Sequence, residues 1–390
     1  MEPSDWKETE FQELLVDRSI SYGVVQPGSH TEQNCVPIIR VNNIRNGVIE
    51  TNDVMKISAE IESKYRRTRL EGGELLITVV GSVGECAIVP DSLKGWNVAR
   101  AVSVARISRS ADVRFVRYSF RSEDIIFQMY GGTNDTVQPT LNLSSLKTLK
   151  LKMPSLPEQR AIAAVLSSLD NKIDLLHRQN KTLEAMAETL FRQWFVEEAS
   201  DDWEEGNLPD EFVFTMGQSP SGDTFNETGE GLPMYQGNAD FGFRFPTRRI
   251  YTTTPSRMAQ ALDTLISVRA PVGAQNMASE ICCIGRGVAA FRYKSAEGYH
   301  AYTYYKLRSM MSDFKQFNAE GTVFGSIGKN DIQQLKVKVP PTDLVEKFHN
   351  EASALDHKVI ANCEQVGTLE KLRDALLPKL MSGEVSVQYE

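Results

Sequence analysis

The chain has few cysteines, and they show no spacing that would suggest a disulfide framework or a metal site. Its 390 residues include five cysteines, which form no CxxC pair and no cluster with the five histidines. An odd cysteine count without framework spacing is typical of reduced thiols in a cytoplasmic protein. We therefore expect a cytoplasmic protein without a structural zinc site.

Long apolar stretches are also missing. A membrane-spanning helix needs about 18 consecutive apolar residues, and the sequence contains no such run. The acidic N-terminal sequence MEPSDWKETEF lacks the apolar centre of a secretory signal. With 41% hydrophobic and 24% charged residues, the composition is that of a soluble globular protein of roughly two to four domains. We therefore expect no membrane partner.

Sequence motifs of catalysis are absent as well. The sequence GSIGKN at 325–330 is not a P-loop, because Val323 stands at the first glycine position and Asn330 at the Ser/Thr position. The chain contains no Asn/Asp-Pro-Pro-Tyr string of an amino-methyltransferase and no HExxH motif, and neither Pro-Asp pair is followed within about thirty residues by a nuclease-type Asp/Glu-x-Lys. We expect a protein that is not an enzyme and that binds no cofactor of its own.

Positive charge is scarce overall but locally concentrated. The net charge of −8 argues mildly against nucleic-acid binding, which favours a basic surface. Part of the acidic excess lies in the segment 197–211, however, and two short segments are basic. Local basic faces are therefore compatible with the negative total. The basic residues of these segments are Lys64, Arg66, Arg67 and Arg69 in the first and Arg244, Arg248 and Arg249 in the second.

The sequence contains an internal repeat. The segment TVQPTLNLSSLKTLKLKMP at 136–154 matches TVFGSIGKNDIQQLKVKVP at 322–340, and RAVSVAR at 100–106 matches RGVAAFR at 286–292. These two matches share one offset in numbering, which we call the main offset. ITVVGSVG at 77–84 resembles ISVRAPVG at 266–273 at a slightly larger offset, and PIIRVN at 37–42 and PMYQGN at 233–238 are suggestive of the same relation. The chain therefore has the order globule, helix, globule, helix, and its diverged globules suggest two related but non-identical binding tasks.

Each helical segment carries a heptad pattern of apolar residues at alternating steps of four and three. A seam this narrow predicts that two helices of about 35–40 residues, about 55–60 Å long, pack on each other. The alternative is that each helix only covers its own globule. Asn180 and Asn362 interrupt the seams and are candidates for fixing the helix register. The seams are Ile162, Leu166, Leu169, Ile173, Leu176, Asn180, Leu183, Ala187, Leu190 and Trp194, and Phe348, Ala352, Leu355, Val359, Asn362, Val366, Leu369, Arg373, Leu376 and Leu380.

The globular halves combine short β-branched runs with glycine-rich turns, which predicts β-rich α+β globules. Loops with small and polar side chains suit contacts to base edges and phosphates, although such loops are also common as ordinary turns. The DNA-binding candidates in the first half are Asn42, Asn43, Arg45, Lys64, Arg66, Arg67, Arg69, Gly132, Thr133, Asn134 and Gln138. Those in the second half are Gln236, Asn238, Arg244, Arg248, Arg249, Gly321, Thr322, Ser326 and Lys329.

Several segments resemble those of one protein family, the specificity subunits of type I restriction-modification systems. PSLPEQR at 154–160 is similar to the start of that family's central helical region, and FRQWF at 191–195 to its body. LLPKLMSGE at 376–384 is similar to the close of the C-terminal region, and the resemblance covers essentially the whole chain. PTDLVEKF at 341–348 departs from the pattern, because it lacks the Pro-Glu-Gln of the first repeat.

The resemblance implies a fold and a set of partners. It implies an α+β protein with a pseudo-twofold repeat: target-recognition globules at 1–153 and 199–340, and helical spacers at 154–198 and 341–390 that pair as an antiparallel coiled coil. Each globule would read one half of a bipartite site in double-stranded DNA. The helices would set the gap and dock two modification subunits, which bind S-adenosylmethionine and methylate adenine; restriction (endonuclease) subunits are a further partner that the resemblance allows.

Two other interpretations remain open from the residues alone. One is a scaffold with two lectin-like or peptide-binding globules on a coiled-coil arm, and the other is a DNA-acting enzyme with an unrecognised site. Clefts of like potential on both globules would argue against the scaffold, and a carboxylate cluster holding a metal would favour the enzyme.

Overall fold

The computed structural model describes residues 6–131, 141–294, 298–318 and 325–388. The chain divides into two compact units, each built from one globule and part of each long helix. Unit 1 comprises residues 1–173 and 368–390, and unit 2 comprises residues 174–367. Within the described residues, none of the helices is both long and apolar enough to cross a membrane.

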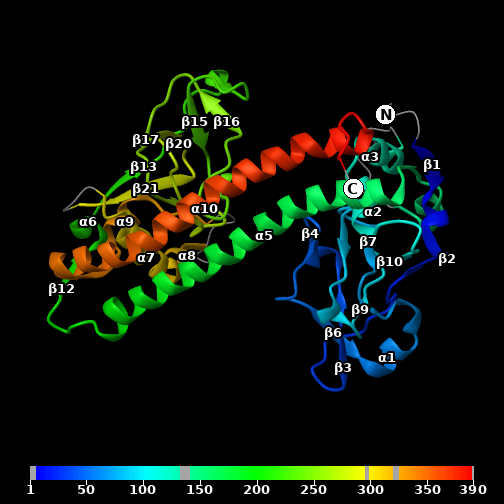
Figure 1. Ribbon diagram of the computed structural model, residues 1–390. Coiled ribbons are helices and arrows are strands. Elements are labelled where there is room, and N and C mark those ends of the chain that lie inside the picture. The colour runs from blue at the N-terminus through cyan, green and yellow to red at the C-terminus, as the bar shows by residue number, and fades with distance from the viewer. Residues whose placement is uncertain (1–5, 132–140, 295–297, 319–324, 389–390) are drawn as a thin grey trace. The chain divides into compact units, whose positions relative to one another are not determined.

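The two long helices are α5 (Leu156–Arg192) and α10 (Thr342–Ser382), and they pack side by side and antiparallel (Figure 1). In unit 1, Asp170 of α5 contacts Arg373 of α10, and in unit 2 Asn180 of α5 contacts Asn362 of α10. The residue numbers of α5 therefore increase in the direction in which those of α10 decrease, as in an antiparallel pair. The heptad positions are buried or half-buried throughout. α10 ends before Gly383, whose φ of +77° suits glycine at a helix end, and it retains Pro378 within its last turns. The predicted α+β fold with an antiparallel helix pair is confirmed.

Unit 1 is built around two β-sheets. The larger has the order β2 (Leu15–Tyr22), β10 (Val102–Ile107), β7 (Leu75–Thr78), β8 (Cys86–Ile88), and the smaller β6 (Met55–Ser58), β3 (Cys35–Ile39), β9 (Asn97–Val98). β1 (Lys7–Glu10) pairs with β11 (Lys150–Met153), and β4 (Ile44–Arg45) forms a hairpin with β5 (Val48–Ile49). The short helices are α1 (Ala59–Ser63), α2 (Val113–Ser119), α3 (Glu123–Tyr130) and α4 (Leu143–Lys147).

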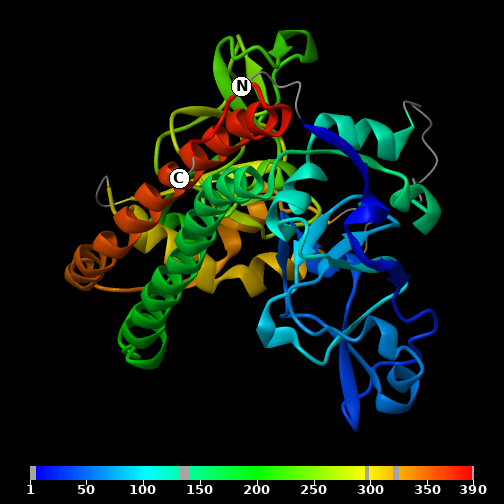
Figure 2. The same cartoon turned by 45° about the vertical axis from the view of Figure 1, so that its right-hand side comes forward.

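The core of unit 1 joins its globule to the helix pair. Phe11 and Phe115 of the globule share one apolar cluster with Ile162 and Leu166 of α5 and with Leu380 of α10. The blue smaller sheet and α1 lie at the end of the unit away from α5 in both views (Figures 1 and 2). The larger sheet therefore lies between that end and the helices.

Unit 2 repeats this architecture. Its larger sheet has the order β13 (Phe212–Met216), β21 (Val288–Tyr293), β18 (Thr264–Ser267), β19 (Gln275–Met277). The second sheet has the order β14 (Phe225–Asn226), β16 (Ile250–Thr252), β15 (Leu232–Tyr235), β20 (Cys282–Ile284), β17 (Met258–Ala259), and β12 (Glu204–Asn207) pairs with β22 (Lys336–Val339). The short helices are α6 (Leu208–Glu211), α7 (His300–Ser309), α8 (Met311–Lys315) and α9 (Lys329–Gln334).

Strand pairing brings the weakest part of the repeat into register. β3 pairs parallel with β9 through Ile38 and Asn97, and β15 pairs parallel with β20 through Met234 and Cys283. Ile38 and Met234 stand at the same place in the match between 37–42 and 233–238, and Asn97 and Cys283 are related by the main offset. The segments at 37–42 and 233–238 are thus structural equivalents.

Candidate DNA interface

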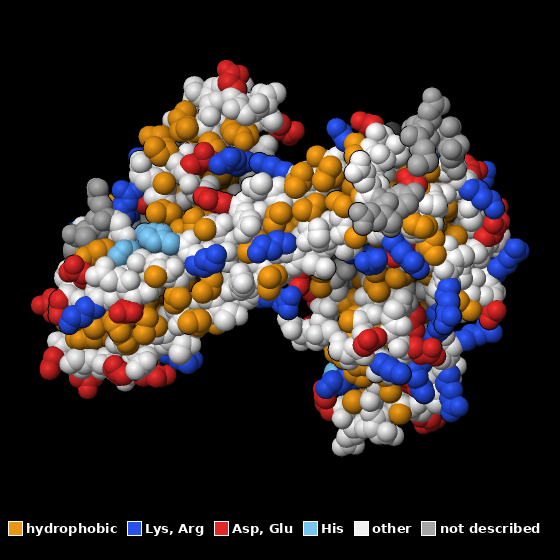
Figure 3. Space-filling view, in the orientation of Figure 1, with side chains coloured by type: hydrophobic (Ala, Val, Ile, Leu, Met, Phe, Trp, Pro, Cys, Tyr) orange, Lys and Arg blue, Asp and Glu red, His pale blue; other side chains and the backbone are white. Residues whose placement is uncertain are grey.

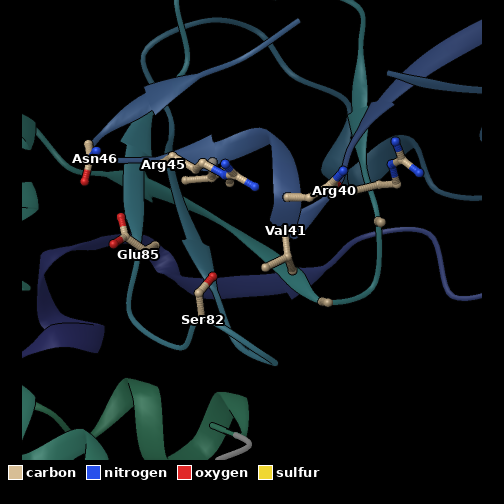
Figure 4. A pocket seen from close by; sticks show the side chains of 10 residues that line it. Arg40, Val41, Arg45, Asn46, Ser82 and Glu85 are labelled. Carbon is tan, nitrogen blue, oxygen red and sulfur yellow. The ribbon is translucent and has the colours of Figure 1, made fainter. Parts of the chain in front are cut away.

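Unit 1 contains an open notch at the ends of β3 and β9. Its volume is about 710 Å³, and it combines the segment after β3, the turn before β8 and the segment after β9. Figure 4 shows Arg45 and Asn46 on one side and Ser82 and Glu85 on the other. The lining residues of this first notch are Arg40, Val41, Asn42, Ile44, Arg45, Asn46, Ser82, Glu85, Ala99 and Ala101.

Unit 2 contains a second notch of about 550 Å³. It lies at the ends of the equivalent strands, β15 and β20. Gly287 allows two backbone segments that line this notch to lie close together, because a Cβ at position 287 would lie 2.1 Å from the carbonyl oxygen of Gln236. The lining residues of this second notch are Ser219, Gln236, Gly237, Asn238, Ala239, Asp240, Arg249, Ile250, Arg269, Ala270, Pro271, Arg286 and Gly287.

The two notches are equivalent sites of the repeat. In unit 1 the amide of Ala99 donates to the carbonyl of Ile39 at 2.9 Å, and in unit 2 the amide of Gly285 donates to that of Tyr235 at 2.8 Å. The main offset relates Ala99 to Gly285, and the match of 37–42 with 233–238 relates Ile39 to Tyr235. The backbone frame is therefore shared, while the side chains that face the notch differ.

The notches differ most in their exposed cations. In the first notch Arg40 pairs with Asp53, and Arg45 is exposed without an ion-pair partner among the described residues. In the second, Arg249 pairs with the buried Asp240, whereas Arg269 and Arg286 are exposed and have no ion pair within the described ranges. Exposed, unpaired guanidinium groups can bind phosphates or the O6 and N7 acceptors of guanine.

In each unit a later segment of the chain bonds to the residue directly after an equivalent strand of the larger sheet, β7 or β18. The amide of Leu141 donates to the carbonyl of Val79, and that of Ile327 donates to the carbonyl of Val268, both at 2.9 Å. Ser326 is exposed, and its backbone forms an isolated antiparallel β-bridge with that of Arg269. This pairing places Ser326, one of the predicted DNA-binding residues, at the rim of the second notch. Lys329 is exposed at the start of α9.

The basic cluster after α1 lies on the surface of unit 1. Lys64, Arg66 and Arg67 are exposed, and Figure 3 shows Lys and Arg side chains gathered over the part of unit 1 around α1 and β2. Arg69 is held instead by Glu62, with Nε 2.8 Å from Oε1, and this hydrogen bond lowers the pKa of the buried Glu62 carboxyl. Arg69 is therefore the least available of the four.

Two predicted contact residues have structural roles. Asn43 is buried, and its side chain accepts from the amide of Arg40 at 2.9 Å and donates to the carbonyl of Asp53 at 2.9 Å. Arg244 is 1% exposed and pairs with Glu184 and Asp356 of the long helices. The structure therefore corrects the prediction for both residues, because a side chain enclosed in this way does not face DNA.

The other predicted residues divide between described and undescribed parts of the chain. Asn42, Gln236, Asn238 and Arg249 are exposed and line the notches, and Arg248 is exposed and pairs with Glu280 at 2.6 Å. The remaining predicted positions lie outside the described residues: Gly132, Thr133, Asn134, Gln138, Gly321 and Thr322.

Sequence reasoning missed Arg40, Arg269 and Arg286. A signal for the last two was present, because Arg286 begins the RGVAAFR match and Arg269 lies within the ISVRAPVG match. A match between repeats does not tell, however, which of the matched side chains face a notch. As to metals, no group of three or more His, Cys, Asp or Glu side chains in the described residues could hold an ion.

Comparison with known proteins agrees with this two-unit architecture. A model of the type I restriction modification DNA specificity domain matches residues 3–185. A putative type I restriction enzyme specificity subunit, MjaX of Methanocaldococcus jannaschii, is 28% identical over 99% of this chain and 95% of its own length. Over its whole length the chain is therefore similar to type I restriction-modification specificity subunits.

Other relatives extend the likeness. The EcoBI specificity subunit of Escherichia coli is 32% identical over 45% of this chain and 37% of its own length. The crystal structure of the type I system S subunit from M. genitalium has the same fold, with a TM-score of 0.60 and 18% identity over 96% of each chain. Specificity subunits are the non-catalytic, DNA-recognising members of type I complexes, so this chain is not itself an enzyme.

Proposed function

We propose that this chain reads a bipartite DNA target, with one half-site contacted by each notch. The observation that carries the proposal is the pair of equivalent notches with different side chains. A shared backbone frame gives both units the same approach to a duplex, and different side chains give each unit its own base preference. Double-stranded DNA is accordingly the ligand of both surfaces.

The long helices would supply spacing and partner docking. At about 1.5 Å per residue, the 37 residues of α5 span about 55 Å, which suits a rigid spacer. Met186 of α5 and Leu372 of α10 are 53% and 46% exposed, and the main offset of the repeat relates them. Two equivalent apolar positions fit two copies of one partner, the modification subunit, which would carry S-adenosylmethionine.

The net charge of −8 bears on how DNA is bound. Neutralising many phosphates requires many cations, and this chain offers only local groups of them. We therefore propose that the isolated chain binds DNA weakly and that modification subunits supply much of the phosphate contact. Restriction subunits are a further proposed partner.

The test is methylation mapping. The chain is co-expressed with the modification subunit of its own system in a host free of methylation, and methyladenine is located by sequencing. We expect a bipartite motif with a fixed gap that disappears when this chain is omitted. A continuous motif, or methylation that does not depend on this chain, would contradict the proposal.

Two variants assign the halves. Arg45→Ala in the first notch should relax one half of the motif, and Arg286→Ala in the second notch the other half. Arg178→Ala serves as the control, because Arg178 is a solvent-exposed helix residue paired with Asp174 at 2.9 Å. Relaxation of both halves by either notch variant would be evidence against one notch per half-site.

A further inference from the structure

In unit 1 a buried ion-pair cluster lies between the long helices and the loop of the first notch. Asp170 of α5 accepts hydrogen bonds from Arg117 at 2.8 Å and Tyr118 at 2.7 Å, both on α2, and from Arg373 of α10 at 3.2 Å. The guanidinium of Arg117 lies 4.8 Å from the centre of the Tyr118 ring. All these charged groups are nearly enclosed, with side-chain exposures of 11% for Arg117 and 15% for Asp170.

Arg117 of this cluster lies against the loop between β4 and β5, next to the first notch. Gly47 forms the turn between β4 and β5, directly after the notch residues Arg45 and Asn46. A Cβ at Gly47 would lie 2.1 Å from Nη2 of Arg117, and the residue has a φ of +80°. The turn therefore rests on the guanidinium, and only glycine fits there without moving it.

In unit 2 the equivalent place is occupied by an arginine from a different part of the chain. Arg244 belongs to the loop that follows the notch residues 236–240, and its side chain is fully buried. It donates to Asp356 of α10 and, at 3.2 Å, to Glu184 of α5. Its guanidinium lies 3.5 Å from the centre of the Tyr304 ring.

The two clusters coincide in the repeat although their arginines do not. The main offset relates Asp170 to Asp356 and Tyr118 to Tyr304. The counterpart of Arg117 at that offset is Thr303, while Arg244 corresponds to Val48 when the match of 37–42 with 233–238 is extended. Each unit thus keeps an aspartate, a tyrosine and a guanidinium together, with the guanidinium supplied by the globule's helix in one unit and by the loop in the other.

We propose that this Asp–Arg–Tyr clamp positions the DNA-reading loop of each unit on the helix pair, through Arg117 at Gly47 in unit 1 and Arg244 in unit 2. Arg117, Asp170, Arg244 and Asp356 are positioning residues, which act on DNA only through the notch side chains. The inference rests on the proposed function for what the loop reads, and on the contacts above for how the loop is held. Because base discrimination needs side chains held in one geometry, a freed loop should lose selectivity before it loses its fold.

The test compares Asp356→Asn in α10 with Asp343→Asn, a control on the same helix whose carboxylate is 75% exposed and lies 3.9 Å from Lys347. Hydrogen exchange is measured on the full chain, and the methylated motif is mapped in the complex. In Asp356→Asn we expect the amides of 241–249 to exchange about tenfold faster or more, which is the scale of losing one charge-assisted hydrogen bond. One half of the motif should become degenerate, the other half unchanged, at a temperature at which melting curves show the chain folded.

The reciprocal variant, Asp170→Asn, should speed exchange at 44–49 and relax the opposite half of the motif. If Asp356→Asn matches Asp343→Asn in both loop exchange and motif, the clamp proposal is overturned. It is also overturned if exchange rises evenly across unit 2 while the motif stays intact, since that pattern is loss of stability alone. A wild-type complex without any bipartite motif contradicts the proposed function instead.

A rescue experiment keeps the proposal testable if Asp356→Asn does not fold. Arg244→Gly combined with Thr303→Arg moves the guanidinium of unit 2 to the position it has in unit 1, next to Tyr304. We expect the double variant to recover slow exchange at 241–249 and the wild-type half-site, relative to Arg244→Gly alone. Failure of the double variant to improve on Arg244→Gly in either readout would contradict the equivalence of the two clamps.

Discussion

Units 1 and 2 hold equivalent aspartates in different electrostatic surroundings. Burial alone would raise the pKa of Asp170, but the hydrogen bond from Tyr118 and the charges of Arg117 and Arg373 outweigh it, so its pKa is lowered. In unit 2 two acids, Glu184 and Asp356, share the single guanidinium of Arg244, and burial raises the pKa of Glu184 despite that charge. Duplication has preserved a contact between helix and loop without preserving the residue that makes it, and unit 2 depends on that one residue more heavily.

The largest expected effect comes from removing the two arginines. Arg244→Ala removes the guanidinium that pairs with two buried carboxylates, which should destabilise unit 2 by about 3–5 kcal/mol. Arg117→Ala should cost about 1–2 kcal/mol, because Asp170 keeps Tyr118 and Arg373. Urea unfolding followed by hydrogen exchange of peptides from each unit measures both, and Arg178→Ala on the exposed face of α5 is the control. Equal losses in the two units would refute the asymmetry.

Acidification should also destabilise unit 2 before it destabilises unit 1. His300 is buried beside His349 and His357, with Nε2 3.2 Å from the Asp356 carboxylate that Arg244 already occupies. Burial, together with the charge of His349, lowers the pKa of His300 to about 4 from 6.5. At His300 the unfolded chain therefore binds a proton that the folded chain does not, so the contribution of this residue to stability falls as pH drops from 6.5 towards 4, by up to roughly 3 kcal/mol.

The matched measurement is the pH dependence of unfolding for the wild type and His300→Asn, which can retain a side-chain donor towards the carbonyl of Gly298. The variant should flatten the slope between pH 6.5 and 4. Unit 1 contains only the exposed His30, and the pKa values of its carboxyls Glu62 and Asp170 are lowered, so its own loss should begin below about pH 4.5. Protection of unit 1 peptides that is lost before that of unit 2 peptides on acidification would reverse the comparison.

A smaller effect should distinguish the notches. Arg100 and Arg286 are repeat equivalents and both are exposed, but only Arg286 lines a notch. Arg286→Ala should therefore weaken binding of the complex to its target by about 1–3 kcal/mol, and Arg100→Ala by less. Fluorescence anisotropy with a target duplex at two salt concentrations measures this, and a uniform loss for target and non-target DNA would assign Arg286 to phosphate contact instead of base reading.

The repeat and the helix pair were predictable because they leave periodic signals in the sequence. The constant main offset and the steps of four and three predicted the helix seam, and the two interrupting polar residues are bonded to each other, with Nδ2 of Asn362 donating to Oδ1 of Asn180 at 2.8 Å. The boundaries between globules and spacers stay a prediction, since each compact unit takes in part of both helices.

The roles of single loop residues were not predictable in the same way. Arg244 is in a polar loop, which suggested a surface cation, but its partners Glu184 and Asp356 are 60 and 112 residues away in sequence. In the sequence, Asn43 cannot be distinguished from an ordinary turn asparagine; only the structure shows its buried hydrogen bonds to Arg40 and Asp53. Local composition carries no information about such distant partners.

The smallest expected effect tests where the units should be alike. If the notches differ because the half-sites differ, a surface that binds two copies of one partner should have diverged least, and Met186 and Leu372 are equivalent exposed apolar residues. Met186→Ser and Leu372→Ser should each weaken one of two modification-subunit sites by about 1 kcal/mol, the scale of half a buried apolar side chain.

Titration of the chain with modification subunit, followed by mass photometry, should show a shift from two bound copies towards one for either variant, and Thr182→Ala provides an exposed helix control. If only one of the two variants loses a bound modification subunit, the two units do not bind the partner through equivalent residues. The pseudo-twofold symmetry would then reflect the duplication of the chain and not the arrangement of its complex.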